Sequence, residues 1–356
     1  MVDPHVHLRD WNDSEKETIL HGLKVAYDCG INEVFDMPNT NPPLTDRETI
    51  LDRLSDANLA IMELKKKDIF YHVYAGVTND ETQIKEIVKT YNELFPMVIG
   101  LKLFAGHSTG NMGIINEEKQ RHIFEVLKKE NYKGVLAIHC EKESLLDNSK
   151  FNKSDFSTQS IARPRIAEIE SIKDMINFAK EAEFEGTIHI AHISTKEGLE
   201  LVKQAKMENL SFKICCGVTP HHVLLDEKSA NNISYAKMNP PLREKEDNEA
   251  LMLGLEDGSI DFIESDHAPH TIRDKKNGAS GIPGFSSTLL LIEKLMGKKV
   301  SKNRIKDLMG RNVYKIFNLD KEGVNFNVKQ AFKLREISNE ASKEYPYDAF
   351  ISLRNK

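Results

Sequence analysis

Short apolar segments rich in β-branched residues alternate along the chain with longer amphipathic segments. The short segments have the length and composition of buried strands, whereas the longer segments repeat their apolar residues at helical spacing. The pattern therefore predicts eight strands, over residues 2–8, 33–37, 70–77, 98–104, 135–140, 187–193, 211–218 and 261–265.

Helices are predicted between and after these strands, over residues 14–29, 46–66, 80–94, 117–129, 161–182, 195–208, 246–255, 287–295 and 302–317. A regular alternation of strands and helices is typical of a parallel α/β sheet. Eight such units fit a closed (β/α)8 TIM barrel, here over residues 1–318. A doubly wound open sheet is the alternative, but it would place a glycine-rich turn after the first strand. The first strand here runs into His-Leu-Arg-Asp instead.

Three polar segments are not predicted to be part of the barrel repeat. Residues 319–356 are weakly periodic, and we expect a short C-terminal extension packed on the barrel. Residues 231–246 and 277–287 contain proline or glycine clusters and are expected to be loops. Residues 106–111, just after the fourth strand, are small and polar; a lid over the site and an ordinary mobile loop are equally good interpretations.

Composition excludes several classes of function. No apolar run reaches the ~18 residues of a membrane span, and the N-terminus has no charged-then-apolar leader. The net charge of −6 and the lack of a basic block argue against a nucleic-acid partner. Four cysteines without a CxxC pair indicate neither a disulfide framework nor a zinc finger. We therefore expect a cytoplasmic globular protein.

Metal-binding residue types stand at the ends of several predicted strands. His5 and His7 are two residues apart, so they share one face of the first strand and can bind the same ion. The fifth, sixth and eighth strands end at or near His139, His192 and Asp266. Each residue alone is more often a hydrogen-bonded histidine or a helix N-cap. Strand ends meet at the active-site rim of such a barrel, and the shared location therefore favours a metal site.

Lys102 lies between two leucines on the fourth predicted strand. The usual interpretation is a lysine whose amine reaches water. A buried lysine has a lowered pKa, and its neutral amine can add carbon dioxide. The resulting carbamate has two oxygens, which would allow it to bridge two metal ions.

With these residues in place, the chain resembles the dihydroorotases of the amidohydrolase superfamily. The matching phrases follow the family order from residue 3 to about residue 284 and include DPHVHLR (3–9), MPNTNP (37–42), GLKLF (100–104), IHCE (138–141), AHISTKE (191–197), VTPHH (218–222), KMNPPLR (237–243) and DHAPH (266–270). The resemblance implies a TIM barrel of the metal-dependent hydrolase type. Many members also have N-terminal strands of a small β-sandwich, whereas this sequence starts almost at its first barrel strand.

The resemblance also implies a metal site with two zinc ions per subunit. According to this resemblance, His5, His7 and Asp266 hold the more buried ion. The second ion is held by His139 and His192. Carboxylated Lys102 bridges the two ions.

For the substrate, the resemblance implies a carboxylate site and a ring site. Positions that bind the substrate carboxylate in the family match Arg9, Asn39 and His270. Positions near the pyrimidine ring match Asn239 and Gly284. The implied reaction is the reversible cyclisation of N-carbamoyl-L-aspartate to L-dihydroorotate in pyrimidine biosynthesis. We expect a metal-bridging hydroxide to attack the ring carbonyl and Asp266 to act as general acid and base.

Two other functions remain open. Another cyclic amidohydrolase, such as a hydantoinase or allantoinase, would share the metal residues, but Arg9 and His270 favour a substrate that carries a carboxylate. An inactive scaffold would have lost some metal ligands, and all six are present. A homodimer is expected from the general frequency of such oligomers.

Overall fold

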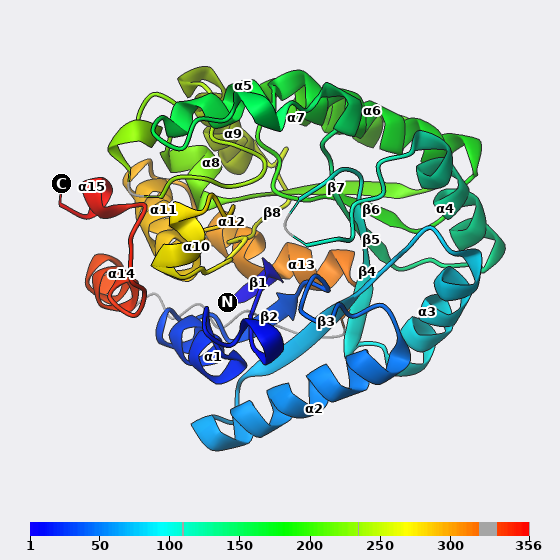
Figure 1. The fold of residues 1–356 in the computed structure, drawn as a ribbon, viewed down its shortest axis with the longest axis horizontal. Coiled ribbons are helices and arrows are strands. Elements are labelled where there is room, and N and C mark those ends of the chain that lie inside the picture. The colour runs from blue at the N-terminus through cyan, green and yellow to red at the C-terminus, as the bar shows by residue number, and fades with distance from the viewer. Residues whose placement is uncertain (109, 234, 320–332, 356) are drawn as a thin grey trace.

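Eight parallel strands form one sheet in chain order, so the predicted barrel is confirmed (Figure 1). The structure is a computed structural model that describes residues 1–108, 110–233, 235–319 and 333–355. Each strand lies within a few residues of its prediction. The strands are β1 (Val2–Val6), β2 (Glu33–Asp36), β3 (Phe70–Gly76), β4 (Val98–Phe104), β5 (Val135–His139), β6 (Thr187–Ile190), β7 (Lys213–Val218) and β8 (Phe262–Ile263).

Helices surround the strands on the outside of the barrel (Figure 1). The longer ones are α1 (Ile19–Asp28), α2 (Arg47–Leu64), α3 (Glu81–Leu94), α4 (Glu117–Lys129), α6 (Arg165–Glu181), α7 (Lys196–Met207), α9 (Lys245–Asp257) and α11 (Phe285–Gly297). Shorter helices are α5 (Gln159–Ala162), α8 (Pro220–Leu224), α10 (Ile272–Lys276), α12 (Lys302–Lys306), α13 (Asn312–Ile316), α14 (Leu334–Ser342) and α15 (Ile351–Arg354). No helix in the described ranges is both long and apolar enough to span a bilayer.

The two faces of the strands pack into different apolar clusters. Leu101 and Leu103 of β4 belong to the cluster that contains Phe124 of α4. A second cluster combines interior residues such as Phe35 of β2 with Phe317, which follows α13. The barrel interior is therefore packed with apolar side chains next to α13, and polar residues gather at the opposite, carboxyl ends of the strands.

The barrel closes between β1 and the segment that follows β8. Val6 and His267 form a parallel bridge, and the backbone amide of His7 donates to the carbonyl of His267 at 2.7 Å. The amide of Asp266 donates to the carbonyl of His5 at 3.1 Å. The two ends of the barrel sequence are thus held side by side at the active-site rim.

Two long predicted helices are wrong as single elements. The pattern over 161–182 is interrupted after Ala162, and α6 starts at Arg165. Pro164 causes the break, because proline lacks an amide hydrogen and disfavours helical geometry in the residue before it. The pattern over 302–317 contains α12, a π-helical segment and α13, with non-helical backbone at Met309 and Gly310.

The described part of the C-terminal segment packs on the barrel. Leu334 and Ala341 of α14 are buried in the main apolar cluster. The hydroxyl of Tyr345 donates to Glu17 Oε1 at 2.7 Å, beside α1. Of the predicted 319–356 extension, residues 320–332 and 356 lie outside the described residues.

A fully buried arginine fixes the chain just after β1. The guanidinium of Arg53, on α2, donates to Asp36 Oδ2 at 2.7 Å. It also donates to the carbonyls of Leu8 and Arg9, at 2.6 and 2.7 Å. This ion pair therefore joins α2 to β2 and to the segment that carries Arg9.

We expect the Arg53→Met variant to lower the free energy of unfolding by about 3–5 kcal/mol, because Asp36 would remain buried without its cation. Arg47→Met is the matched control on the same helix, since Arg47 pairs with Glu93 at an exposed position. That control should change stability by less than about 1 kcal/mol. Urea unfolding of both variants measures the difference, and equal effects would contradict the assigned role of Arg53.

Candidate metal centre

Polar side chains from nearly every strand end converge on one cavity. It is lined by His5, His7, Arg9, Asn39, Lys102, Phe104, Ser108, His139, His192, Asn239, Asp266, Ala268, Ser280 and Gly281. The cavity contains all six predicted metal ligands and three of the predicted substrate-binding residues, Arg9, Asn39 and Asn239. His270 and Gly284 are the two predicted residues that do not line it.

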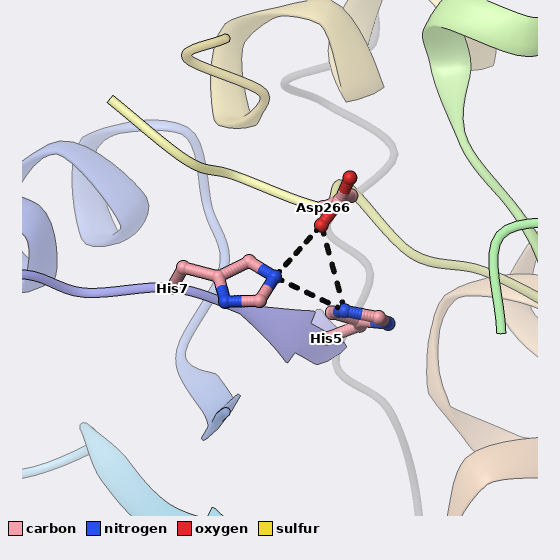
Figure 2. Close-up of side chains that lie close together, drawn as sticks. All are labelled: His5, His7 and Asp266. Atoms are coloured by element: carbon pink, nitrogen blue, oxygen red, sulfur yellow. Dashed lines mark hydrogen bonds and ion pairs between the residues drawn. The ribbon is translucent and has the colours of Figure 1, made fainter. Parts of the chain in front are cut away.

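His5, His7 and Asp266 direct one ligand atom each toward a common point, as Figure 2 shows. The Nε2 atoms of His5 and His7 are 3.3 Å apart. Asp266 Oδ1 lies 2.9 Å from His7 Nε2 and 3.4 Å from His5 Nε2. Imidazole nitrogen and carboxylate oxygen are both zinc ligands, and the donor set therefore fits a divalent cation.

A second histidine pair lies beside this cluster. His139 Nδ1 and His192 Nε2 are 3.1 Å apart, and the ring centroids of His5 and His192 are separated by 5.2 Å. Burial lowers the pKa of all three imidazoles, and the nearby Lys102 amine lowers each further. The rings are therefore neutral and retain the lone pairs that a metal ligand needs.

Lys102 is fully buried on β4, between the two histidine groups in the cavity wall. Its Nζ has no hydrogen-bond acceptor within the described part of the chain and lies 5.0 Å from the Phe104 ring centroid. Burial lowers the pKa of this amine to about 8. An unpaired buried ammonium is energetically unfavourable, so the environment increases the share of neutral amine that is available for modification.

Two of the predicted ligands adopt left-handed backbone conformations. The φ angles are 39° at His192 and 48° at Asp266. This region costs roughly 1–2 kcal/mol for a residue with a Cβ atom. Such backbone strain concentrates at functional sites, where the surrounding structure holds it in place.

Carboxylates lie close behind two of the imidazoles. Glu264 Oε2 lies 3.3 Å from His5 Nδ1, and Glu141 Oε2 lies 2.9 Å from His139 Nε2. Arg163 in turn holds Glu141, with Nη2 donating to Oε2 at 2.6 Å. Partners of this kind fix the ring orientation of metal-binding histidines.

Glu264 and Arg163 were missed at the level of sequence. Glu264 could have been found, because it stands two residues before Asp266. Arg163 has no such signal, since its role depends on the helix break at Pro164.

Arg9 is a buried cation without an anionic partner among the described residues. Its Nε donates to the carbonyl of Pro269 at 3.1 Å, and its Nη2 lies 3.4 Å from His270 Nε2. Burial lowers its pKa. Because no carboxylate of the described residues pairs with it, the guanidinium can bind a carboxylate in the cavity.

Asn39 contacts a metal-ligand candidate directly. Its Oδ1 lies 2.7 Å from His7 Nδ1. An amide oxygen only accepts, so the ring donates from Nδ1 and keeps the Nε2 lone pair for the cluster. Asn39 thus orients His7 while it lines the cavity.

Of the remaining predicted substrate residues, one lines the cavity and one lies behind its wall. Asn239 lines the cavity and accepts from Gln159 at 2.7 Å. The amide of Gly284 donates to His267 Nδ1 at 3.1 Å, behind the cavity wall. The wall itself is formed by Ser280 and Gly281, so a contact between Gly284 and a ring stays a prediction.

Ser108 of the candidate lid also lines the cavity, while Thr109 lies outside the described residues.

The chain is similar to proteins named dihydroorotase. No protein-family model matches it. The dihydroorotase of Pyrococcus horikoshii is 34% identical over 298 residues, which cover 82% of this chain and 59% of that protein. The dihydroorotase of Pyrococcus furiosus is 32% identical over 347 residues, covering 96% of this chain and 71% of that protein. The chain thus spans 59% and 71% of the length of these two relatives.

Solved structures with the same barrel include several cyclic amidohydrolases. L-Hydantoinase (dihydropyrimidinase) from Arthrobacter aurescens has a TM-score of 0.77 at 24% identity, over 89% of this chain and 70% of that one. Dihydroorotase from Campylobacter jejuni has a TM-score of 0.67 at 22% identity, over 90% of this chain and 84% of that one. At these identities the likeness supports the fold alone.

Removing one imidazole from the cluster should release metal. We expect His7→Ala to weaken zinc binding by more than roughly 100-fold, since even partners outside the ligand set contribute 10–100-fold. His122→Ala is the control, because His122 is an exposed histidine on α4. Zinc content after purification without chelator measures the effect, and equal zinc in both variants would refute the cluster as a metal site.

Proposed function

The chain belongs to the dihydroorotase family, and on that basis we propose that it catalyses the reversible cyclisation of N-carbamoyl-L-aspartate to L-dihydroorotate. One observation carries the proposal beyond family membership. The buried guanidinium of Arg9, which pairs with no carboxylate of the described residues, shares a cavity with the His5, His7 and Asp266 cluster. A substrate with both a carboxylate and a cyclic amide matches these two features.

We propose that the site holds two zinc ions. His5, His7 and Asp266 would hold one ion, and His139 and His192 the other. Lys102 would bridge them as a carbamate: its neutral amine attacks carbon dioxide, a nitrogen–carbon bond forms, and one proton leaves. The buried, unpartnered Nζ of Lys102 supports this modification, because a carbamate would replace a poorly solvated amine by a ligated anion.

Bound zinc would polarise the amide carbonyl and lower the pKa of a nearby water. Asp266 directs Oδ1 toward His5 and His7, so Oδ2 is the oxygen left for proton transfer (Figure 2). In ring opening, Asp266 accepts a proton from water and passes it to the amide nitrogen as the ring bond breaks. In ring closure, the carbamoyl nitrogen attacks the side-chain carboxyl carbon, and Asp266 takes the proton from this nitrogen and passes it to the carboxyl oxygen that leaves as water.

Arg9 would bind the substrate carboxylate through two parallel N–H donors, a geometry that lysine cannot reproduce. Asn39 lines the same cavity next to His7, and His270 lies behind the lining, next to Arg9. Asn239 would contact the ring from the loop before α9. These contacts would place the amide carbonyl over the metal centre.

Substrate comparison tests the proposal directly. We expect the zinc-loaded protein to hydrolyse L-dihydroorotate at least 100-fold more efficiently, by kcat/KM, than hydantoin or allantoin, because neither offers the same ring carboxylate to Arg9. Arg9→Gln should remove most of this preference. If the protein hydrolyses hydantoin or allantoin efficiently but not dihydroorotate, it is another cyclic amidohydrolase. If it turns over none of these substrates, it is an inactive scaffold.

Lys102→Ala should lose zinc and activity together, because the bridge between the two ions would be missing. In the metal-free wild type, added bicarbonate should increase zinc uptake, and labelled bicarbonate should give a carbamate carbon signal by NMR. The Lys102→Ala variant should show neither response. Lys119→Ala, at an exposed position on α4, is the matched control and should behave as wild type. A bicarbonate-independent wild type that binds two zinc ions would contradict the bridging role.

A further inference from the structure

Lys275 of α10 is a buried lysine outside the metal centre. Its side chain is almost entirely buried, yet no carboxylate pairs with it in the described ranges. Its Nζ donates to three backbone carbonyls: Lys237 at 2.9 Å, Ala279 at 2.8 Å and Gly281 at 2.7 Å. All three ammonium donors are therefore used on main-chain acceptors.

These carbonyls belong to two loops that form part of the cavity wall. Residues 237–240 contribute Asn239, and residues 279–281 contribute Ser280 and Gly281. The amide of Gly281 also donates to the carbonyl of Lys237 at 2.9 Å, which joins the loops directly. Lys275 thus lies where the two loops meet, behind the surface that faces the cavity.

The same loops reach the proposed carboxylate site. His270 Nε2 lies 2.9 Å from the carbonyl of Ser280, and a carbonyl only accepts, so the ring donates this bond. The same imidazole nitrogen is 3.4 Å from Arg9 Nη2. A shift of residues 279–281 would therefore move His270 relative to Arg9.

Burying a charged side chain at this position costs desolvation free energy, which only the hydrogen bonds of that side chain can offset. Burial lowers the pKa of Lys275, with the charges of Lys237 and Arg9 lowering it further. A methionine of similar length would pack there without desolvating a charge. The lysine instead donates to the carbonyls of Ala279 and Gly281, which lie outside regular secondary structure, and adds a second donor to the carbonyl of Lys237.

We propose that Lys275 is a positioning residue that holds the loops 237–240 and 279–281 in their substrate-binding geometry. The identity of the substrate in this proposal rests on the proposed function, whereas the role of Lys275 in holding the two loops does not. Lys275 sets affinity for the substrate, while the metal centre and the chemical step are independent of it. It touches neither the cavity nor the metal ligands.

The test compares Lys275→Met with Lys276→Met, the exposed neighbour on the same short helix. In the zinc-loaded enzyme, Lys275→Met should raise KM for L-dihydroorotate at least 10-fold. We expect kcat to stay within threefold and zinc content to be unchanged. Lys276→Met should leave all three within twofold of wild type. An unchanged KM in Lys275→Met, or a parallel loss of zinc and kcat, overturns the proposal.

Deuterium exchange tests the loops without any substrate. In Lys275→Met, amides of residues 237–239 and 279–282 should exchange at least 10-fold faster, while peptides that contain His5 and His139 keep wild-type rates. Unchanged loop exchange overturns the proposal even if the wild type has no dihydroorotate activity. If Lys275→Met does not fold, Lys275→Gln replaces it; its amide retains two donors, and an intermediate increase in loop exchange is expected.

Discussion

Closure of the barrel between β1 and the segment after β8 is the constraint on which the site depends. The hydrogen bonds that join His5 and Asp266, and His7 and His267, are between backbone atoms. They do not depend on the metal, and they bring together residues from opposite ends of the barrel sequence. The His5, His7 and Asp266 cluster is therefore a consequence of closing the sheet, so the fold provides the ligand geometry in advance.

Buried cations in this protein fall into two kinds. Arg53 has Asp36 as a buried partner and stabilises the fold around β1 and β2. Arg9, Lys102 and Lys275 have no anionic partner among the described residues, and all three lie in or directly behind the cavity wall. An excess of positive charge in a poorly solvated site attracts anions. Burial is the main reason why the nearby imidazoles are held neutral, and the charge of Lys102 adds to it.

The sequence pattern predicted the barrel because each strand buries β-branched residues and each helix has an apolar face. It also predicted the cavity residues on β1, β4 and β5, since strand ends must meet at one rim. Contacts made by loops were less predictable. The sequence predicts a ring contact for Gly284, which stays a prediction, whereas Ser280 and Gly281, earlier in the same loop, line the cavity.

Lys275 had no signal in the sequence, because a lysine in a polar helix is normally exposed. Its burial follows from the path of two loops around it, and periodicity does not describe such paths. The sequence predicts which helix or strand carries a side chain more readily than it predicts the partner of that side chain, when the partner is a loop carbonyl. The same holds for the described part of the tail, where α14 packs against α11 and Tyr345, three residues after α14, donates to Glu17.

The failure of the helix prediction at Pro164 has a functional explanation. Arg163 stands at the break with φ of −128° and ψ of 73°, outside helical geometry. From there its guanidinium holds Glu141 behind His139 and also donates to the carbonyl of His107 at 2.7 Å, in the candidate lid. A continuous helix would give Arg163 a different backbone direction and separate these two contacts. The break that interrupts local periodicity thus connects a metal-ligand candidate to the loop above it, and departures from local preference are expected at such sites.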